Sequence, residues 1–96
     1  MRVRIPRSAI EDLARGREFY EKQMGGLGSY FLDTLYSDID SLALYGGVHR
    51  RVFGYHRVVS NRFPYAIYYK VVEGVVEVWR VLDCRQNSTK TRQALQ

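Results

Sequence analysis

The stretch "RFPYAIYYKVVEGVVEVWRVLDCR", residues 62–85, decides the fold of this chain. Two runs rich in aromatic and β-branched residues flank Glu73-Gly74, a pattern typical of two antiparallel strands joined by a tight turn. We expect these strands over residues 63–72 and 75–83, with Pro64 near the start of the first, where no ladder donor is needed. The hairpin predicts the centre of an antiparallel sheet.

The register of this hairpin has two solutions. A two-residue turn pairs Lys70 with Glu77, an opposite-charge pair, but it also pairs Arg80 with Ile67. A three-residue turn places Val81 opposite Ile67 and removes Arg80 from that face. The sequence leaves both registers open.

The N-terminal residues predict a strand and a helix. Residues 2–5 alternate and stop at Pro6, which is typical of a short strand. Ser8 and Glu11 have the spacing of a capping box, so we expect the helix to begin there. Its apolar positions, at a spacing of three to four, are Ile10, Leu13, Ala14, Tyr20 and Met24. We expect its acidic residues to lie on a solvated face and to have no role in acid–base catalysis. They are Glu11, Asp12, Glu18 and Glu21.

A glycine-rich break separates this helix from a second one. Gly25, Gly26 and Gly28 interrupt the periodicity, Ser29 is expected to cap the next helix, and Gly46 to end it. The predicted buried face carries Phe31, Leu32, Leu35, Tyr36, Ile39, Leu42 and Ala43. So short a connection predicts an antiparallel helical hairpin.

These elements define the fold class. Together with a further strand over residues 55–60, they predict a single α+β domain over residues 1–96. We expect an N-terminal strand, the two-helix antiparallel hairpin, then a three-stranded antiparallel sheet, with the helices packed on the sheet. In the C-terminal residues, Asn87 or Ser88 is a possible cap for a final helical turn.

Composition excludes several classes of protein. No apolar run approaches the roughly 20 residues of a membrane span, and the N-terminal residues lack a secretory leader pattern. The single cysteine, Cys84, allows no internal disulfide and no cysteine cluster, and we interpret it as a packed or tolerated thiol. A cytoplasmic protein without a membrane partner is expected.

Positive charge is concentrated in the second half of the chain. Residues 1–47 carry six Lys/Arg against seven Asp/Glu, whereas residues 48–96 carry nine against three. A basic surface attracts nucleic acid or an acidic protein segment through the same long-range field, and it also promotes solubility. The sequence favours an anionic partner for this half.

No standard catalytic or metal motif occurs. The chain lacks a phosphate-binding glycine loop, a G-x-S-x-G elbow and an H-E-x-x-H pair. His49 and His56 stand seven residues apart without further ligands in a metal spacing. We therefore predict no metal and no cofactor.

Basic side chains interleaved with aromatics remain as candidates. Guanidinium groups bind phosphates or carboxylates through a planar fork at any physiological pH, and tyrosines offer stacking surfaces. Alternation nevertheless predicts that half of the tyrosines belong to the core. The residues expected to bind an anionic partner are Arg50, Arg51, Arg57, Arg62, Lys70 and Arg85.

The order of elements, with "FPYAIYYKV" followed by "VWRVLDCRQN", resembles the RelE/ParE superfamily of bacterial toxins, also called plasmid-stabilisation proteins. The resemblance covers essentially the whole chain. It implies a compact antiparallel sheet with the helix pair on it. It also implies the toxin of a type II toxin–antitoxin module, held inactive by an antitoxin whose acidic tail the basic residues would bind.

The superfamily contains ribosome-dependent mRNA endonucleases and ParE-like proteins that poison DNA gyrase. Of the positions where the resemblance places the basic catalytic residues of the endonucleases, this chain has a basic residue at Arg57 and Arg85. They are replaced at Val59 and Ala66, and no tyrosine stands near Thr91, where the resemblance places one. Loss of one such donor costs about 2.7–4 kcal/mol of transition-state stabilisation, so the resemblance favours the ParE-like branch.

Three functions therefore stay open. The first is a ParE-like toxin that binds a protein such as DNA gyrase. The second is an endonuclease acting on the ribosome and mRNA, whose catalytic residues would be Arg57, Arg62 and Arg85. The third is an inactive member that serves only as a binding partner.

Overall fold

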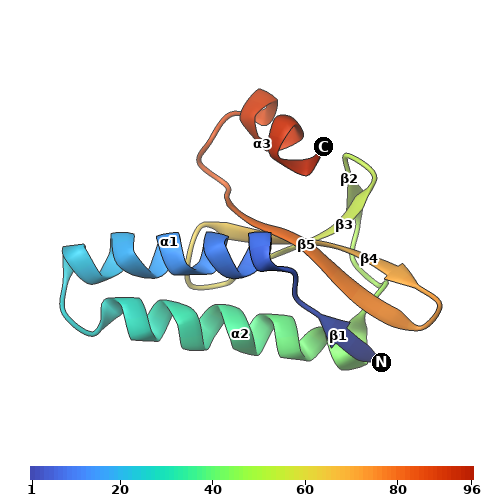
Figure 1. The fold of residues 1–96 in the computed structure, drawn as a ribbon, viewed down its shortest axis with the longest axis horizontal. Helices are drawn as coiled ribbons and strands as arrows, with labels where there is room; N and C mark the ends of the chain where they lie inside the picture. The colour runs from blue at the N-terminus through green and yellow to red at the C-terminus, as the bar shows by residue number, and fades with distance from the viewer.

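The structure, a computed structural model, describes residues 1–96 as an α+β fold (Figure 1). The strands are β1 (Arg2–Arg4), β2 (Arg51–Val52), β3 (Tyr55–Val59), β4 (Tyr65–Val72) and β5 (Val75–Asp83). The helices are α1 (Arg7–Gln23), α2 (Leu27–Tyr45) and α3 (Ser88–Leu95). One mixed sheet has the strand order β1-β5-β4-β3-β2, with β1 parallel to β5 and the other pairs antiparallel. The predicted fold class is confirmed, and β2 is an additional short strand.

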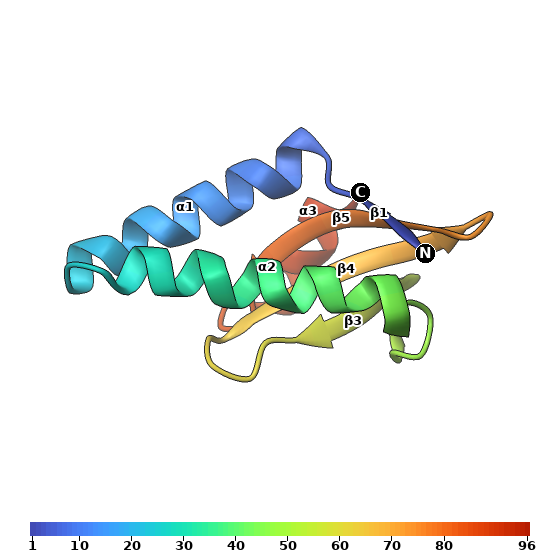
Figure 2. The same ribbon diagram turned by 90° about the horizontal axis from the view of Figure 1, so that it is seen from below.

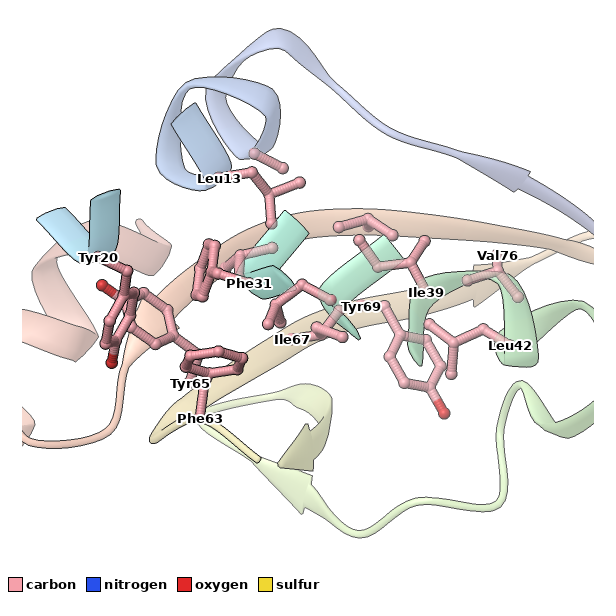
Figure 3. Close-up of a cluster of buried hydrophobic side chains, with 14 residues drawn as sticks. Leu13, Tyr20, Phe31, Ile39, Leu42, Phe63, Tyr65, Ile67, Tyr69 and Val76 are labelled. Atoms are coloured by element: carbon pink, nitrogen blue, oxygen red, sulfur yellow. The ribbon is translucent and has the colours of Figure 1, made fainter. Parts of the chain in front are cut away.

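Helices cover the sheet from both sides. The α1–α2 hairpin lies along one face, and α3 lies beyond β5 on the other (Figures 1 and 2). Fourteen buried residues form the larger cluster, between the hairpin and the sheet (Figure 3). The smaller cluster, on the α3 face, consists of Ala66, Tyr68, Leu82 and Leu95. Because successive strand residues point to opposite faces, β4 contributes to both clusters.

The two helices follow the predicted periodicity unequally. Every predicted core position of α2 is buried or half-buried. In α1, by contrast, Ile10 and Ala14 are exposed, and Met24, one residue beyond the helix, is 63% exposed, so this part of the prediction was wrong. The buried stripe of α1 instead contains Ala9, Leu13, Gly16 and Tyr20, at a spacing of four, three and four residues. Of the predicted positions, Leu13 and Tyr20 belong to that stripe, and Ile10, Ala14 and Met24 lie outside it.

The predicted serine caps of α1 and α2 are also wrong. Helix α1 begins at Arg7, one residue after Pro6, without a side-chain cap. Helix α2 begins at Leu27 and is capped from α1, because Glu21 accepts hydrogen bonds from the backbone N–H groups of Gly26 and Gly28 at 3.0 and 2.9 Å. The carboxylate of Glu21, from the neighbouring helix, therefore caps α2 in place of Ser29. The predicted Asn87 cap of α3 is confirmed.

The β4–β5 hairpin uses both predicted registers. Next to the turn, Lys70 pairs with Glu77, as the two-residue turn requires. A bulge opposite Tyr68 and Tyr69 then shifts the ladder, and Ile67 pairs with Val81. The extra residue restores an apolar side chain to the helix-covered face, since an uninterrupted ladder would have placed Arg80 opposite Ile67.

Candidate functional site

The basic residues of the second half are mostly free of internal ion pairs. Of the nine Lys/Arg in residues 48–96, two form salt bridges: Arg80 with Asp12, and Arg85 with Asp83. The seven without a salt bridge are Arg50, Arg51, Arg57, Arg62, Lys70, Lys90 and Arg92. No internal carboxylate neutralises them, and an anionic ligand for them stays a prediction.

Arg57 stands on β3 opposite Tyr68 of β4. Its guanidinium carbon lies 6.0 Å from the Tyr68 ring centre, and Nη2 lies 3.6 Å from Sγ of Cys84. Its Nε is buried and has no hydrogen-bond partner within the protein. Arg57 is therefore held on the α3 face of the sheet with an unused donor.

Lys70 lies on the same face, two residues beyond Tyr68 along β4. Its Nζ is 4.7 Å from the ring centre of Tyr55 and 5.9 Å from that of Trp79. These are cation–π distances, so the two rings orient the ammonium group without neutralising it. The lysine is exposed and makes no salt bridge.

The end of α3 is tied to this face by three side-chain donors. The Leu95 carbonyl accepts from the Tyr55 hydroxyl at 2.9 Å and from Nε1 of Trp79 at 3.2 Å. The Ala94 carbonyl accepts from Nη1 of Arg80 at 3.0 Å. These bonds satisfy the carbonyl groups that a helix C-terminus leaves unpaired. They fix α3 beside the β2–β3 hairpin, where the chain ends in Figure 1.

We refer to the surface formed here by Phe53, Tyr55, Arg57, Lys70, Trp79 and Arg92 as the basic-aromatic face. Its residues come from the β2–β3 turn, β3, β4, β5 and α3. Arg92 of α3 completes it, with its guanidinium carbon 5.2 Å from the ring centre of Phe53. Sequence reasoning identified Arg57 and Lys70 but missed Phe53 and Arg92. Nothing in the local pattern signals that α3 returns to the β2–β3 turn.

The other predicted binding residues are dispersed. Arg50 and Arg51 are exposed at β2. Arg62 belongs to the β3–β4 connection, where its Nη1 donates to the Tyr30 hydroxyl at 2.8 Å. It lines a separate hollow of about 300 Å³ against α2. The structure thus brings Arg57 and Lys70 together on one face and places Arg62 elsewhere.

Arg85 follows β5 and lies beside the end of α1. It forms a salt bridge of 2.7 Å with Asp83, and its guanidinium carbon is 5.7 Å from the Phe19 ring centre. The hydrogen bond from Arg85 lowers the pKa of Asp83 below its usual value. Arg85 lines a groove of about 350 Å³ between α1, β5 and α3. The edge of the Arg85 guanidinium that carries Nε and Nη2 is therefore already paired with an internal carboxylate.

Tyr65 lines the same groove and is buried. Burial raises the pKa of Tyr65 to about 12, and Asp83 adds to this effect. The phenol consequently stays protonated near neutral pH. It can donate a hydrogen bond there, but it does not act as a base.

Two acidic residues of α1 do not lie on a solvated face, contrary to expectation. The Asp12 side chain is 3% exposed and accepts from Arg15, from Arg80 and from the backbone N–H of Val81. Glu21 caps α2, as described above. Both have structural roles that sequence periodicity does not reveal, because their partners are distant in the chain or beyond a turn.

The histidines form a structural cluster around Tyr69. Nδ1 of His49 contacts the Tyr69 hydroxyl, which also accepts from the backbone N–H of Gly47 at 3.0 Å. Nδ1 of His56 donates to the His49 carbonyl at 2.6 Å, and its ring stacks on Tyr69. No group of three or more His, Cys, Asp or Glu in the chain is arranged to hold a metal ion. None of the three helices combines the length and apolar character needed to cross a bilayer.

Comparisons with known proteins extend this description. No protein-family model matches the sequence, and no curated protein matches it significantly. The fold is similar to that of a chain in a solved structure described as "Chromosomal ParDE TA system from P. aeruginosa", with a TM-score of 0.76. Sequence identity is 16%, and the match covers 84% of this chain and 92% of that chain. At this identity the likeness shows the fold, which is the RelE/ParE-like fold that the sequence resemblance predicted.

Proposed function

We propose that this chain is the toxin of a type II toxin–antitoxin pair, in its ParE-like form. In this proposal it arrests growth by binding a protein target such as DNA gyrase, and an antitoxin with an acidic tail neutralises it. The observation that carries the proposal is the structural likeness to a chain of a ParDE toxin–antitoxin system over 84% of this chain. Fold alone hosts many functions, so the side chains must be consistent with it.

The arrangement of the arginines supports binding over RNA cleavage. Arg57, Arg62 and Arg85 line three different hollows, and Arg85 is paired with Asp83. Cleavage by a 2′-hydroxyl needs donors aimed at one phosphate and a group that moves a proton. A protein-binding surface has no such requirement, because its charges act over a wide area.

The antitoxin part of the proposal is supported by the free charge. Five of the six predicted binding residues, all but Arg85, make no salt bridge within the chain. A complementary acidic segment would find these cations unpaired, so association would not require breaking internal ion pairs.

Induced expression in a bacterial host, followed by a supercoiling assay with purified gyrase, tests the proposal. We expect growth arrest and inhibited supercoiling, without new 5′ ends in translated transcripts. Clear transcript cleavage with unaffected gyrase would replace the proposal by the endonuclease function, and Arg85→Ala should then relieve the arrest. Unimpaired growth at high expression would instead indicate an inactive binding protein.

A further inference from the structure

Tyr69 of β4 has its ring inside the core and its hydroxyl at the edge of the buried cluster (Figure 3). This hydroxyl contacts two residues of the α2–β2 connector, residues 46–50. It accepts from the backbone N–H of Gly47 at 3.0 Å, and Nδ1 of His49 contacts it. His56 of β3 stacks on the ring, and its Nδ1 donates to the His49 carbonyl at 2.6 Å. Three hydrogen bonds that involve these side chains therefore join the connector to the sheet.

The direction of these hydrogen bonds determines which nitrogen of His49 carries a proton. The Tyr69 oxygen accepts from Gly47, and Nδ1 of His49 is the acceptor that its own hydrogen can reach. That nitrogen is therefore unprotonated, and the His49 ring is neutral. Nδ1 of His56 already carries a proton, because a carbonyl only accepts. A second proton on His56 leaves its bond in place, so His49 is the ring whose protonation the cluster opposes.

Protonation of His49 reverses its hydrogen bond with Tyr69. An imidazolium ring has two N–H donors and no acceptor. The Tyr69 oxygen would then face two donors, from Gly47 and from His49, and the phenol hydrogen would lose its acceptor. A buried polar group without its partner is costly, so protonation favours the separation of Gly47 and His49 from Tyr69.

The charges around the cluster act in the same direction. His56 of β3 and Tyr69 of β4 are the titratable groups that contact or stack beside His49, and no carboxylate of α2 or of any other element forms an ion pair with either histidine. Arg51 and Lys70 line a hollow of about 170 Å³ together with His56. Burial, and the neighbouring His56, lower the pKa of His49. A proton on His49 therefore finds no compensating negative charge.

The connector has few other attachments to the sheet. Strand β2 contains two residues, lies at the end of the sheet and pairs with β3. One further backbone hydrogen bond, of 2.9 Å, runs from the N–H of Arg57 to the carbonyl of Arg50. Residues 46–52 include no buried residue. Segments with so few buried contacts open at a lower free energy than the whole domain.

We propose that His49, Tyr69 and His56 form a proton-operated latch, which is closed while His49 is neutral and which releases residues 46–52 from β3 and β4 when acid protonates His49. Arg50 and Arg51 lie in this segment, so the pH would control the placement of two exposed cations. The proposal concerns the chain by itself and does not depend on the function proposed above. It goes beyond a loss of overall stability, because the segment opens while the rest of the sheet stays folded.

The pH range of the latch follows from proton linkage. Free histidine has a pKa of about 6.5, and the closed latch holds the pKa of His49 below that value. The closed state is therefore complete above about pH 6.5. Between this pH and the lower pKa of the closed state, the opening equilibrium rises up to tenfold for each pH unit, and at still lower pH it becomes constant.

Amide hydrogen exchange of the full chain between pH 5 and 7.5 tests the latch, with each rate divided by that of an unstructured amide at the same pH. We expect Gly47 to exchange at least tenfold faster than Ile67, which lies in β4 between two paired strands. The protection of Gly47 should fall with the pH as described above. Equal protection of Gly47 and Ile67 would overturn the proposal, because the segment would then open only with the whole chain. A His49 ring that titrates at or above pH 6.5, followed by its NMR signals, would overturn it as well.

Three variants test the role of the individual groups. Tyr69→Phe removes the hydroxyl and keeps the ring, so Gly47 should lose at least tenfold protection at pH 7.5, and the pKa of His49 should move toward 6.5. His49→Asn places an acceptor that does not titrate near the position of Nδ1, so Gly47 should stay protected at every pH. Tyr65→Phe is the matched control in β4, because its hydroxyl lines the groove beside Arg85 instead, and it should change neither result.

The two latch variants can each contradict the proposal. Wild-type protection of Gly47 in a folded Tyr69→Phe chain would show that the hydroxyl does not hold the connector. An unchanged pH dependence in His49→Asn would show that another group is the sensor. The second result decides the question by itself if Tyr69→Phe does not fold.

Discussion

Asp12 of α1 and Arg80 of β5, 68 residues apart, form a two-pronged ion pair. Nε of Arg80 donates to Oδ2 at 2.7 Å and Nη2 donates to Oδ1 at 2.8 Å. Asp12 also accepts a hydrogen bond from the backbone N–H of Val81. This N–H has no partner in β1, because the pairing of β1 with β5 ends at Glu77. One carboxylate therefore joins the helical hairpin to the sheet directly beyond the β-bulge.

Replacing Asp12 with alanine should destabilise the protein strongly. Removal of one partner from a buried ion pair leaves the other uncompensated, at a cost of about 3–5 kcal/mol. Arg15→Gln is the control, because Arg15 contacts the same carboxylate but its side chain is 65% exposed. Exposed pairs contribute about 0–1 kcal/mol. Urea unfolding of both variants measures the difference, and equal losses would contradict this account of Asp12.

Gly16→Ala should weaken the contact between α1 and α2. A Cβ at Gly16 would lie 2.5 Å from a ring carbon of Phe31, which is fully buried. Overpacking of this kind costs about 1–3 kcal/mol and outweighs the helix propensity gained, about 1 kcal/mol. At Gly25 the nearest atom is 4.0 Å away, so Gly25→Ala should be neutral by thermal unfolding. A Gly16→Ala variant as stable as the wild type would show that Phe31 moves freely.

Glu73→Asn should stabilise the β4–β5 hairpin. Glu73 has φ of 50° and precedes Gly74 in a turn with both residues left-handed. The left-handed conformation costs a residue such as Glu about 1–2 kcal/mol, and Asn tolerates it better. An increase of about 1 kcal/mol corresponds to about 4–8 °C in melting temperature for a domain of this size. Glu73→Gln keeps the strain and should show no increase, which separates backbone conformation from charge.

Stability should fall as the pH is lowered below about 6.5, the ordinary pKa of histidine. Burial, and the neighbouring His56, lower the pKa of His49. The folded state then binds fewer protons than the unfolded state, so the contribution is complete above pH 6.5 and is lost as the pH falls through the folded pKa. Asp83, whose pKa is lowered from 3.8, contributes only in a more acidic range. Urea unfolding between pH 5 and 7.5 should show the slope, and His49→Gln should flatten it.

The sequence predicted the elements whose signals are local. Strands β4 and β5 and the helix α2 follow from side-chain periodicity. The Asn87 side chain caps α3 by accepting a hydrogen bond from the backbone N–H of Lys90, only three residues further along the chain. Their formation depends on neighbours in the chain, so the pattern contains the relevant information.

Sequence reasoning failed where a partner from elsewhere replaces a local one. Ser29 is a good cap by pattern, but Glu21 reaches the same N–H groups across the turn. By its periodicity Asp12 should face solvent. It is buried instead, because its carboxylate accepts hydrogen bonds from the distant Arg80 and from the backbone N–H of Val81. Neither outcome is visible before the helices have been placed.

For the candidate site, the sequence by itself determined the charge imbalance and the presence of arginines and aromatics on strands. Only the tertiary structure decided that Arg57 and Lys70 share a face, that α3 adds Arg92 to it, and that Arg62 does not belong to it. The physical reason is that a sequence fixes the chemistry of each side chain and its side of its own strand. Which groups meet depends on the register, the bulge and the way the last helix folds back over the sheet.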